Sequence, residues 1–77
     1  MENTRKVDKR IRRTKKILTE ALIEILKEKN VMDVTVSELA KKADVTRTTF
    51  YQYYRDPVDM LEQLQDEIAE DIQKIVE

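Results

Sequence analysis

The sequence predicts an all-α protein, a small helical bundle that forms a single domain. It has no Gly and one Pro in 77 residues, so the strongest helix breakers are nearly absent. Apolar residues recur every three or four positions in two long segments, and no segment alternates as a half-buried strand does. A chain of this length builds only one small core.

The first predicted helix covers about residues 9–29, where one face is apolar and Glu20, Glu24 and Lys27 face elsewhere. A turn over residues 30–34 follows, because Asn and Asp favour turns. The apolar face of this helix consists of Ile11, Leu18, Ala21, Leu22, Ile25 and Leu26.

The second predicted helix covers residues 35–43 and begins with Thr-Val-Ser-Glu, which has the form of a capping box. In that motif the Thr35 hydroxyl accepts from the backbone N–H of Glu38, and the Glu38 carboxylate accepts in return. Two of its apolar residues are Ala, so this helix can lie close to a neighbour. Its apolar stripe consists of Val36, Leu39, Ala40 and Ala43.

The third and fourth predicted helices cover residues 46–54 and 57–76. Asp44 favours a local turn, and Thr46 can cap the third helix through its hydroxyl. Asp56 and Pro57 end this helix and start the next, since Asp is a good N-cap and Pro suits the first helical position. The fourth helix has an apolar stripe of Val58, Leu61, Leu64, Ile68, Ile72 and Ile75.

All four aromatic residues of the chain lie within residues 50–54, FYQYY. Helical geometry predicts that Phe50 and Tyr54 share one face, which anchors the third helix. Tyr51 and Tyr53 then point outward with Gln52, where a phenol can reach phosphate or a base edge. An alternative is that all four rings belong to the core. The predicted packing partners of the anchoring rings are Leu22, Leu39, Ala40 and Leu61.

The charge of the chain is strongly asymmetric along its length. Residues 1–16 hold eight Lys or Arg against two acids, whereas residues 57–77 hold one Lys against seven acids. A basic N-terminal arm, residues 1–10, together with the start of the first helix is typical of a phosphate-binding surface, and solvated, disordered charge at a terminus is the alternative. The acids Glu62, Asp66 and Glu70 form a solvated helix face and no cation site, because hard cations want six or more converging oxygens.

Composition excludes most enzyme classes. The chain has no Cys and no His, which removes thiol nucleophiles, imidazole bases and the usual zinc ligands. Without Gly it also lacks a phosphate-cradling loop, so we expect no cofactor, no metal and no catalytic activity. No apolar run reaches the roughly 18 residues of a membrane span, and no signal peptide is visible, so we expect a cytoplasmic protein.

Two short helices joined by a tight turn, residues 35–54, fit a helix-turn-helix, whose second helix enters the DNA major groove. The segment TVSELAKKADVTRTTFYQYYRDPVDML, residues 35–61, resembles the DNA-binding domain of TetR-family transcriptional regulators, and residues 12–26 resemble the first helix of that family. The positions that carry the resemblance are Thr35, Ala40, Val45, Thr46, Phe50, Tyr51 and Tyr54.

The resemblance implies double-stranded DNA as the partner. Residues at the start of the third helix would face base edges and phosphates, Tyr51 would contact phosphate, and Gln52 and Tyr53 would reach bases or sugar. The basic segment would follow the phosphates. The candidate DNA-binding residues are Thr35, Ser37, Thr46, Arg47, Thr48, Thr49, Tyr51, Gln52, Tyr53 and Arg55, with Arg12, Arg13 and Lys16 from the basic segment.

Three positions depart from the family pattern. Asp44 replaces the usual turn Gly, which is tolerable because Asp visits left-handed dihedral angles more readily than most residues. Tyr53 replaces a common His, and Pro57 stands where the family often has a phosphate-contacting Lys. Arg55 and the basic arm could supply the phosphate contact instead.

The resemblance also implies a repressor that binds a palindromic operator as a homodimer. A C-terminal domain, which binds a small-molecule effector and forms the dimer, is not in this sequence, so we expect a fragment or excised domain. The residues Ile68, Ile72, Ile75 and Val76 would then overhang the bundle, unless the first helix covers them. A competing hypothesis is a helical protein-interaction module that uses this stripe.

Overall fold

The computed structural model describes the backbone of residues 2–76 and the side chains of residues 9–70. This part of the chain is helical and contains no strand, which confirms the all-α prediction. Four α-helices are joined by short turns, and a single 3-10 turn lies between the first two. The elements are α1 (Glu2–Leu26), η1 (Val31–Asp33), α2 (Val36–Ala43), α3 (Arg47–Tyr53) and α4 (Pro57–Val76).

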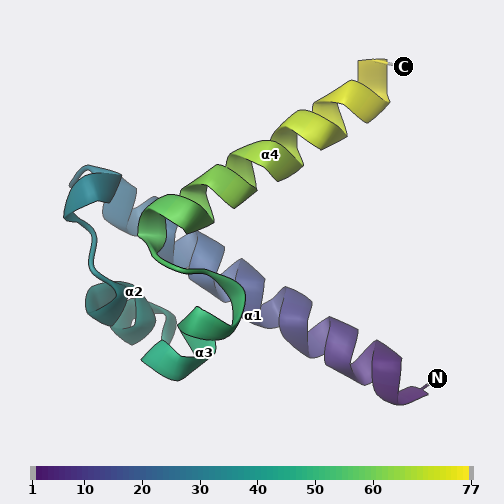
Figure 1. Cartoon of the computed structure of the whole chain (residues 1–77), viewed down its shortest axis with the longest axis horizontal. Coiled ribbons are helices and arrows are strands. Elements are labelled where there is room, and N and C mark those ends of the chain that lie inside the picture. The colour runs from purple at the N-terminus through teal and green to yellow at the C-terminus, as the bar shows by residue number, and fades with distance from the viewer. Residues whose placement is uncertain (1, 77) are drawn as a thin grey trace.

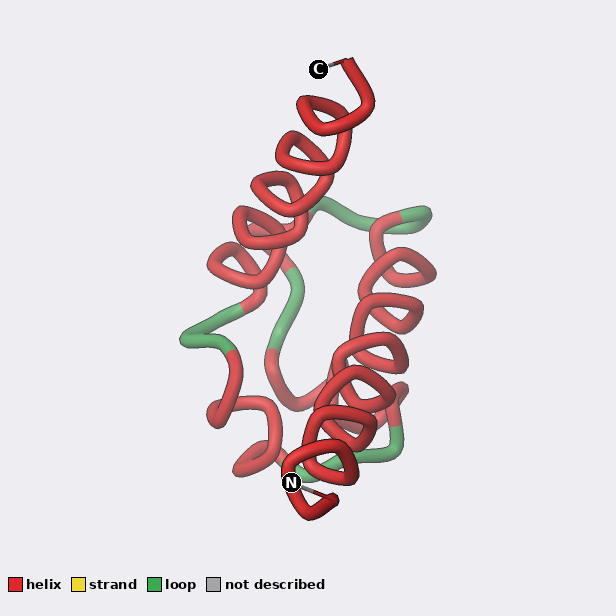
Figure 2. The backbone as a smooth tube through the Cα atoms, turned by 90° about the vertical axis from the view of Figure 1, so that its right-hand side faces the viewer, coloured by secondary structure: helices red, strands yellow, loops and turns green. Residues whose placement is uncertain are grey.

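The two long helices cross, and the two short ones pack beneath the crossing (Figure 1). The N-terminal end of α1 and the whole of α3 lie at one end of the molecule, while the C-terminal end of α4 lies at the opposite end (Figures 1 and 2). The molecule measures 36 × 34 × 18 Å. The shortest of these dimensions, 18 Å, is less than two helix diameters of about 10–12 Å each. All four helices share one core.

Helix α1 differs from its predicted bounds of 9–29 at both ends. It runs from Glu2 to Leu26, so the segment 2–10, expected to be an arm, is the first part of this helix. The sequence of α1 holds no Gly or Pro that would stop a helix, and extending a helix costs much less than nucleating one. Its C-terminal end comes early because the N–H groups of Lys27 and Glu28 turn to carbonyls three residues back.

The connection from α1 to α2 contains η1, which the sequence analysis treated as a simple turn. The Asn30 side chain accepts from the backbone N–H of Met32 and caps this short element. Lys29 then reaches α2, where its Nζ lies 2.9 Å from Oε2 of Glu38. This pair fixes the start of α2 against the end of α1.

The predicted capping box of α2 is confirmed. The N–H of Glu38 donates to the Thr35 hydroxyl at 3.1 Å, and the N–H of Thr35 donates to Oε1 of Glu38 at 3.0 Å. The hydrogen bond from Lys29, and then the one from the Thr35 N–H, holds the pKa of Glu38 below its usual value. Glu38 therefore stays a charged acceptor at neutral pH.

The turn between α2 and α3 depends on a left-handed residue. Asp44 has φ 57° and ψ 43° and is the only non-Gly residue with positive φ in the described chain. The N–H of Asp44 donates to Lys41 and Ala40 carbonyls, and the N–H of Val45 donates to the Ala40 carbonyl at 2.9 Å. This is a Schellman motif, which ends α2 and sets the angle at which α3 leaves.

Replacing Asp44 by a β-branched residue is expected to loosen this turn. Asp44→Val should destabilise the fold by about 1–2 kcal/mol, because a Cβ-branched side chain clashes with the backbone in the left-handed region. Asp44→Asn is the matched control, since Asn also visits this region, and it should be close to neutral. Thermal unfolding followed by circular dichroism measures both. A Val variant as stable as the Asn variant would contradict this account of the turn.

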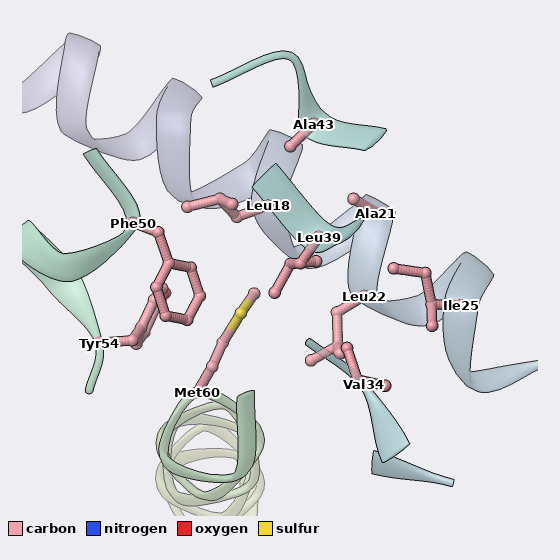
Figure 3. Close-up of a cluster of buried hydrophobic side chains, with 10 residues drawn as sticks. All are labelled: Leu18, Ala21, Leu22, Ile25, Val34, Leu39, Ala43, Phe50, Tyr54 and Met60. Atoms are coloured by element: carbon pink, nitrogen blue, oxygen red, sulfur yellow. The ribbon is translucent and has the colours of Figure 1, made fainter. Parts of the chain in front are cut away.

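The core gathers side chains from every helix around Phe50, which is fully buried (Figure 3). The predicted apolar faces of α1 and α2 pack in or against the core except for Ile11, which is half-buried and lies outside the cluster, and Phe50 and Tyr54 anchor α3 as expected. Val34 and Met60 are two core members that apolar periodicity did not predict. Met60 is fully buried and reaches from the start of α4 toward Leu39. The cluster consists of Leu18, Ala21, Leu22, Ile25, Val34, Leu39, Ala43, Phe50, Tyr54 and Met60.

Among the described side chains of α4, residues 57–70, those of the first two turns contact the core. Pro57 and Met60 are buried, and Leu61 and Leu64 pack against the core as partly buried residues. One helical turn beyond Leu64, Ile68 is 58% exposed, so α1 does not cover the predicted stripe at this position. The side chains of Ile72, Ile75 and Val76 lie outside the described residues.

Candidate nucleic-acid interface

Helix α3 presents a polar face to solvent at its N-terminal end. Arg47 and Thr48 are exposed at the first two helical positions, and Gln52 is exposed one turn later. Arg47 makes no ion pair with any carboxylate of residues 9–70, so its guanidinium is available to an external acceptor. A guanidinium with two parallel N–H donors suits phosphate or a guanine edge.

The Thr46 and Thr49 hydroxyls serve the helix as well. The N–H of Thr49 donates to Oγ1 of Thr46 at 3.1 Å, which confirms the predicted cap of α3. Their two hydroxyl oxygens lie 3.0 Å apart and share a hydrogen bond. A contact from either hydroxyl to DNA would have to coexist with this cap.

The FYQYY segment divides its rings between the core and the surface. Phe50 and Tyr54 are buried, with ring centroids 5.6 Å apart, whereas Tyr51 is 57% exposed. Tyr51 packs edge-on against Phe50 at 5.6 Å and 81°, so its exposed ring is held in place by the core. The alternative in which all four rings are core is therefore wrong.

Tyr53 differs from its predicted outward position. Its ring is half-buried and packs against the core beside Tyr54, with centroids 6.4 Å apart. Lys15 of α1 lies over both rings, with Nζ 5.9 Å from each centroid. The periodicity of α3 alone did not predict the half-buried position of Tyr53, because α1 crosses the C-terminal end of α3 and covers part of the Tyr53 ring.

Burial raises the pKa of the Tyr54 phenol above its usual value, and the negative charges of Glu67 and Asp59 add to the effect. The Tyr54 hydroxyl is thus protonated at neutral pH. Tyr54 is one of the residues that line the space between α1 and α4, and its neutral hydroxyl can donate a hydrogen bond.

The start of α2 offers one free hydroxyl. The Thr35 hydroxyl is occupied by the capping box, whereas no hydrogen bond within residues 9–70 engages the exposed Ser37 hydroxyl. Both residues lie in the first turn of α2, as expected. Of the two secondary candidates, Ser37 is therefore the better placed to meet a ligand.

The basic residues of α1 divide between two faces of the helix. Arg12, Arg13 and Lys16 are all exposed. Arg12 and Lys16 line a crevice of about 620 Å³ between α1 and α4, which we call the α1–α4 crevice. Arg13 instead lines a hollow on another face of α1. The crevice residues are Ile11, Arg12, Lys15, Lys16, Thr19, Glu20, Tyr54, Leu64 and Glu67.

The junction between α3 and α4 carries acids that the sequence analysis did not treat as part of the site. The N–H of Asp59 donates to Oδ1 of Asp56 at 2.7 Å, which confirms Asp56 as the cap of α4. The N–H of Arg55 donates to Oδ2 of Asp59 at 2.9 Å, and its guanidinium lies 3.8 Å from the same carboxylate. Both the backbone N–H and the guanidinium of Arg55 therefore interact with the Asp59 carboxylate.

Helices α2 and α3, with their tight turn and outward polar face, define the chain as a helix-turn-helix DNA-binding protein. Residues 18–64 match the family model for bacterial regulatory proteins of the TetR family. The chain belongs to the TetR family. The family is one of bacterial regulatory proteins, which are DNA-binding regulators and not enzymes.

Among curated proteins, the chain is 31% identical over 62 residues to YxbF of Bacillus subtilis, an uncharacterized HTH-type transcriptional regulator. The aligned segment is 79% of this chain and 16% of YxbF, so the chain spans only a small part of that relative's length. No solved structure matches the chain significantly.

None of the helices of residues 2–76 combines the length and apolarity needed to cross a membrane. Among residues 9–70, whose side chains are described, no three acidic side chains lie where they could hold a metal ion together.

Proposed function

We propose that this domain binds a specific operator by docking α3 in the major groove of DNA. The observation that carries the proposal is the exposed face of α3, where Arg47, Thr48, Tyr51 and Gln52 point to solvent while Phe50 fixes the helix to the core. Rigid helices with outward polar side chains suit the width of the major groove.

Charge supports this orientation. The N-terminal end of α1, which belongs to the basic part of the sequence, lies at the same end of the molecule as α3 (Figures 1 and 2). The C-terminal end of α4, from the acidic part of the sequence, lies at the opposite end. A polyanion approaching α3 is therefore attracted by α1 and kept away from the outer end of α4.

Membership of the TetR family supports a finer proposal for the regulatory role. We propose a repressor that acts as a homodimer on a palindromic operator, because a helix-turn-helix domain reads one half-site and two-fold symmetry supplies the other. In the full-length protein a separate C-terminal domain would form the dimer and bind a small-molecule effector. The 77-residue chain alone is then expected to bind DNA weakly.

Arg47→Ala is expected to relax operator preference at one or two base pairs, at a cost of roughly 1–3 kcal/mol for the preferred base. Arg47→Lys, which keeps the charge without the planar pair of donors, is the matched control. Selection of bound duplexes from a random library with the full-length protein measures the preference. If Arg47→Ala lowered binding equally for every sequence, Arg47 would be a phosphate contact and the base readout would be wrong.

A second candidate function is supported by Ile68, whose large exposed side chain would suit a partner helix. This protein-interaction module would leave NMR chemical shifts of α3 unchanged when duplex DNA is added at low salt. Shifts confined to α1 and α3 would instead support the DNA-binding proposal.

A further inference from the structure

Lys15 occupies an unusual place between α1 and α3. It is half-buried, and its Nζ lies 5.9 Å from the centroids of both the Tyr53 and the Tyr54 rings. Both distances fall within the roughly 6 Å range of cation–π attraction. Within residues 9–70, no carboxylate forms an ion pair with Lys15. Its charge is thus held by two rings and left without a close internal anion.

The C-terminal end of α3 lacks a cation of its own. Helix α3 has no basic residue in its last turn, although the exposed carbonyls there favour positive charge. Arg55, the next residue after the cap, has its guanidinium 3.8 Å from Asp59. Lys15 lies beside this end of α3 and, among the described residues, forms no ion pair with a carboxylate.

The ammonium of Lys15 remains accessible. Lys15 lines the open α1–α4 crevice together with Arg12 and Lys16, the two exposed cations of the same wall. Two acids, Glu20 and Glu67, also line the crevice, but neither pairs with Lys15. The flexible four-carbon stem of Lys15 lets the ammonium turn from the two rings toward an anion outside.

We propose that Lys15 and the Tyr53 hydroxyl bind one DNA phosphate together at the C-terminal end of α3, an inference that rests on the proposed docking of this helix. The two rings already hold the Lys15 ammonium beside this end of α3, so less side-chain freedom is lost on binding than for an unrestrained lysine. The phenol donates to the same phosphate. This pair supplies the contact for which Pro57, at the start of α4, has no cation.

The test uses the 77-residue chain and two mixed-sequence duplexes of unrelated sequence, with affinity followed by fluorescence anisotropy across a salt series. Lys15→Gln and Lys15→Met remove the charge, and Met keeps an apolar stem on the rings. We expect both to lower affinity for both duplexes by roughly 3- to 10-fold at 0.1 M salt and to reduce the salt slope by about 0.9, the value for one phosphate.

Lys15→Arg and Lys27→Gln separate this phosphate contact from the effect of net charge, and Tyr53→Phe tests the hydroxyl. Lys15→Arg should keep the wild-type slope. Lys27→Gln removes one positive charge from the other end of α1, where Lys27 pairs with Glu24 at 3.0 Å, and should leave binding unchanged. Tyr53→Phe keeps the ring and loses the hydroxyl, so its effect should be smaller in the Lys15→Met background than in the wild type.

Three results would overturn the inference. A folded Lys15→Met protein with the wild-type slope would show that Lys15 touches no phosphate. Altered preference between the two duplexes at constant slope would make Lys15 a positioning residue for α3 only. If the full-length protein bound no duplex at low salt and selected none from a random library, the proposed function itself would fail, whereas wild-type binding with insensitive Lys15 variants would reject this inference alone.

Discussion

Phe50→Ala is expected to unfold most of the chain at room temperature. Phe50 is fully buried and contacts both neighbouring Tyr rings at centroid distances of 5.6 Å. Truncating a buried Phe to Ala costs about 3–5 kcal/mol, since apolar contacts are lost and a cavity remains. A core in a chain of this size supplies only about 3–5 kcal/mol in total. Circular dichroism should show a large loss of helix.

Gln52→Ala is the matched control for this prediction, because Gln52 lies on the same helix and is exposed. It should change the free energy of unfolding by less than about 0.5 kcal/mol. A cooperative unfolding transition of Phe50→Ala at a temperature close to that of Gln52→Ala would show that the core does not depend on this ring.

Neutralising Arg12, Arg13 and Lys16 together is expected to weaken binding to every duplex. Gln at all three positions preserves helix propensity while removing three positive charges. If each contacts one phosphate, the salt slope should fall by about 2.7, and affinity at 0.1 M salt should fall by roughly 10²- to 10³-fold. Operator preference among sequences should stay the same, because phosphate contacts carry no direct sequence information.

A double variant, Lys27→Gln with Lys29→Gln, tests whether position matters beyond net charge. Both residues follow the C-terminal end of α1, and both pair with acids, Glu24 and Glu38. Their removal should leave the slope within about 0.5 of the wild-type value. If it lowered affinity as strongly per charge as the triple change, the attraction would come from the overall field and not from a surface beside α3.

Arg13 is set apart from the other two basic residues of this prediction. It lines a different face of α1 from Arg12 and Lys16, which share the α1–α4 crevice. The three residues look equivalent in the sequence because they lie within five positions of one another. Their separation follows from the 100° turn between successive helical residues and from the direction in which α1 crosses α3.

Local signals in the sequence predicted most of the fold. The capping box at Thr35, the caps at Thr46 and Asp56 and the turn at Asp44 depend on a few neighbouring residues, and all four are confirmed. The N-terminal extent of α1 was wrong because no local signal marks its start. Met60 was missed because its burial depends on where α4 meets the core, which periodicity alone does not fix.

For the candidate interface, the sequence predicted those side-chain positions that depend on the geometry of a single helix. The outward positions of Arg47, Thr48 and Gln52 followed from the spacing around Phe50, and the structure agrees. The spacing did not predict that Tyr53 is half-buried or that Lys15 lies over its ring, because both features result from the way α1 crosses α3. Contacts between helices that are distant in sequence depend on packing angles, which a single sequence does not specify.

The split of α3 into inward and outward residues has a consequence for how such a protein changes over time. Phe50 holds the helix through the core, while Arg47, Thr48 and Gln52 carry no described core contact. Substitutions at these three outer positions could accumulate without unfolding the domain. A duplicated copy of the gene could thus acquire a new target sequence while its scaffold stayed intact.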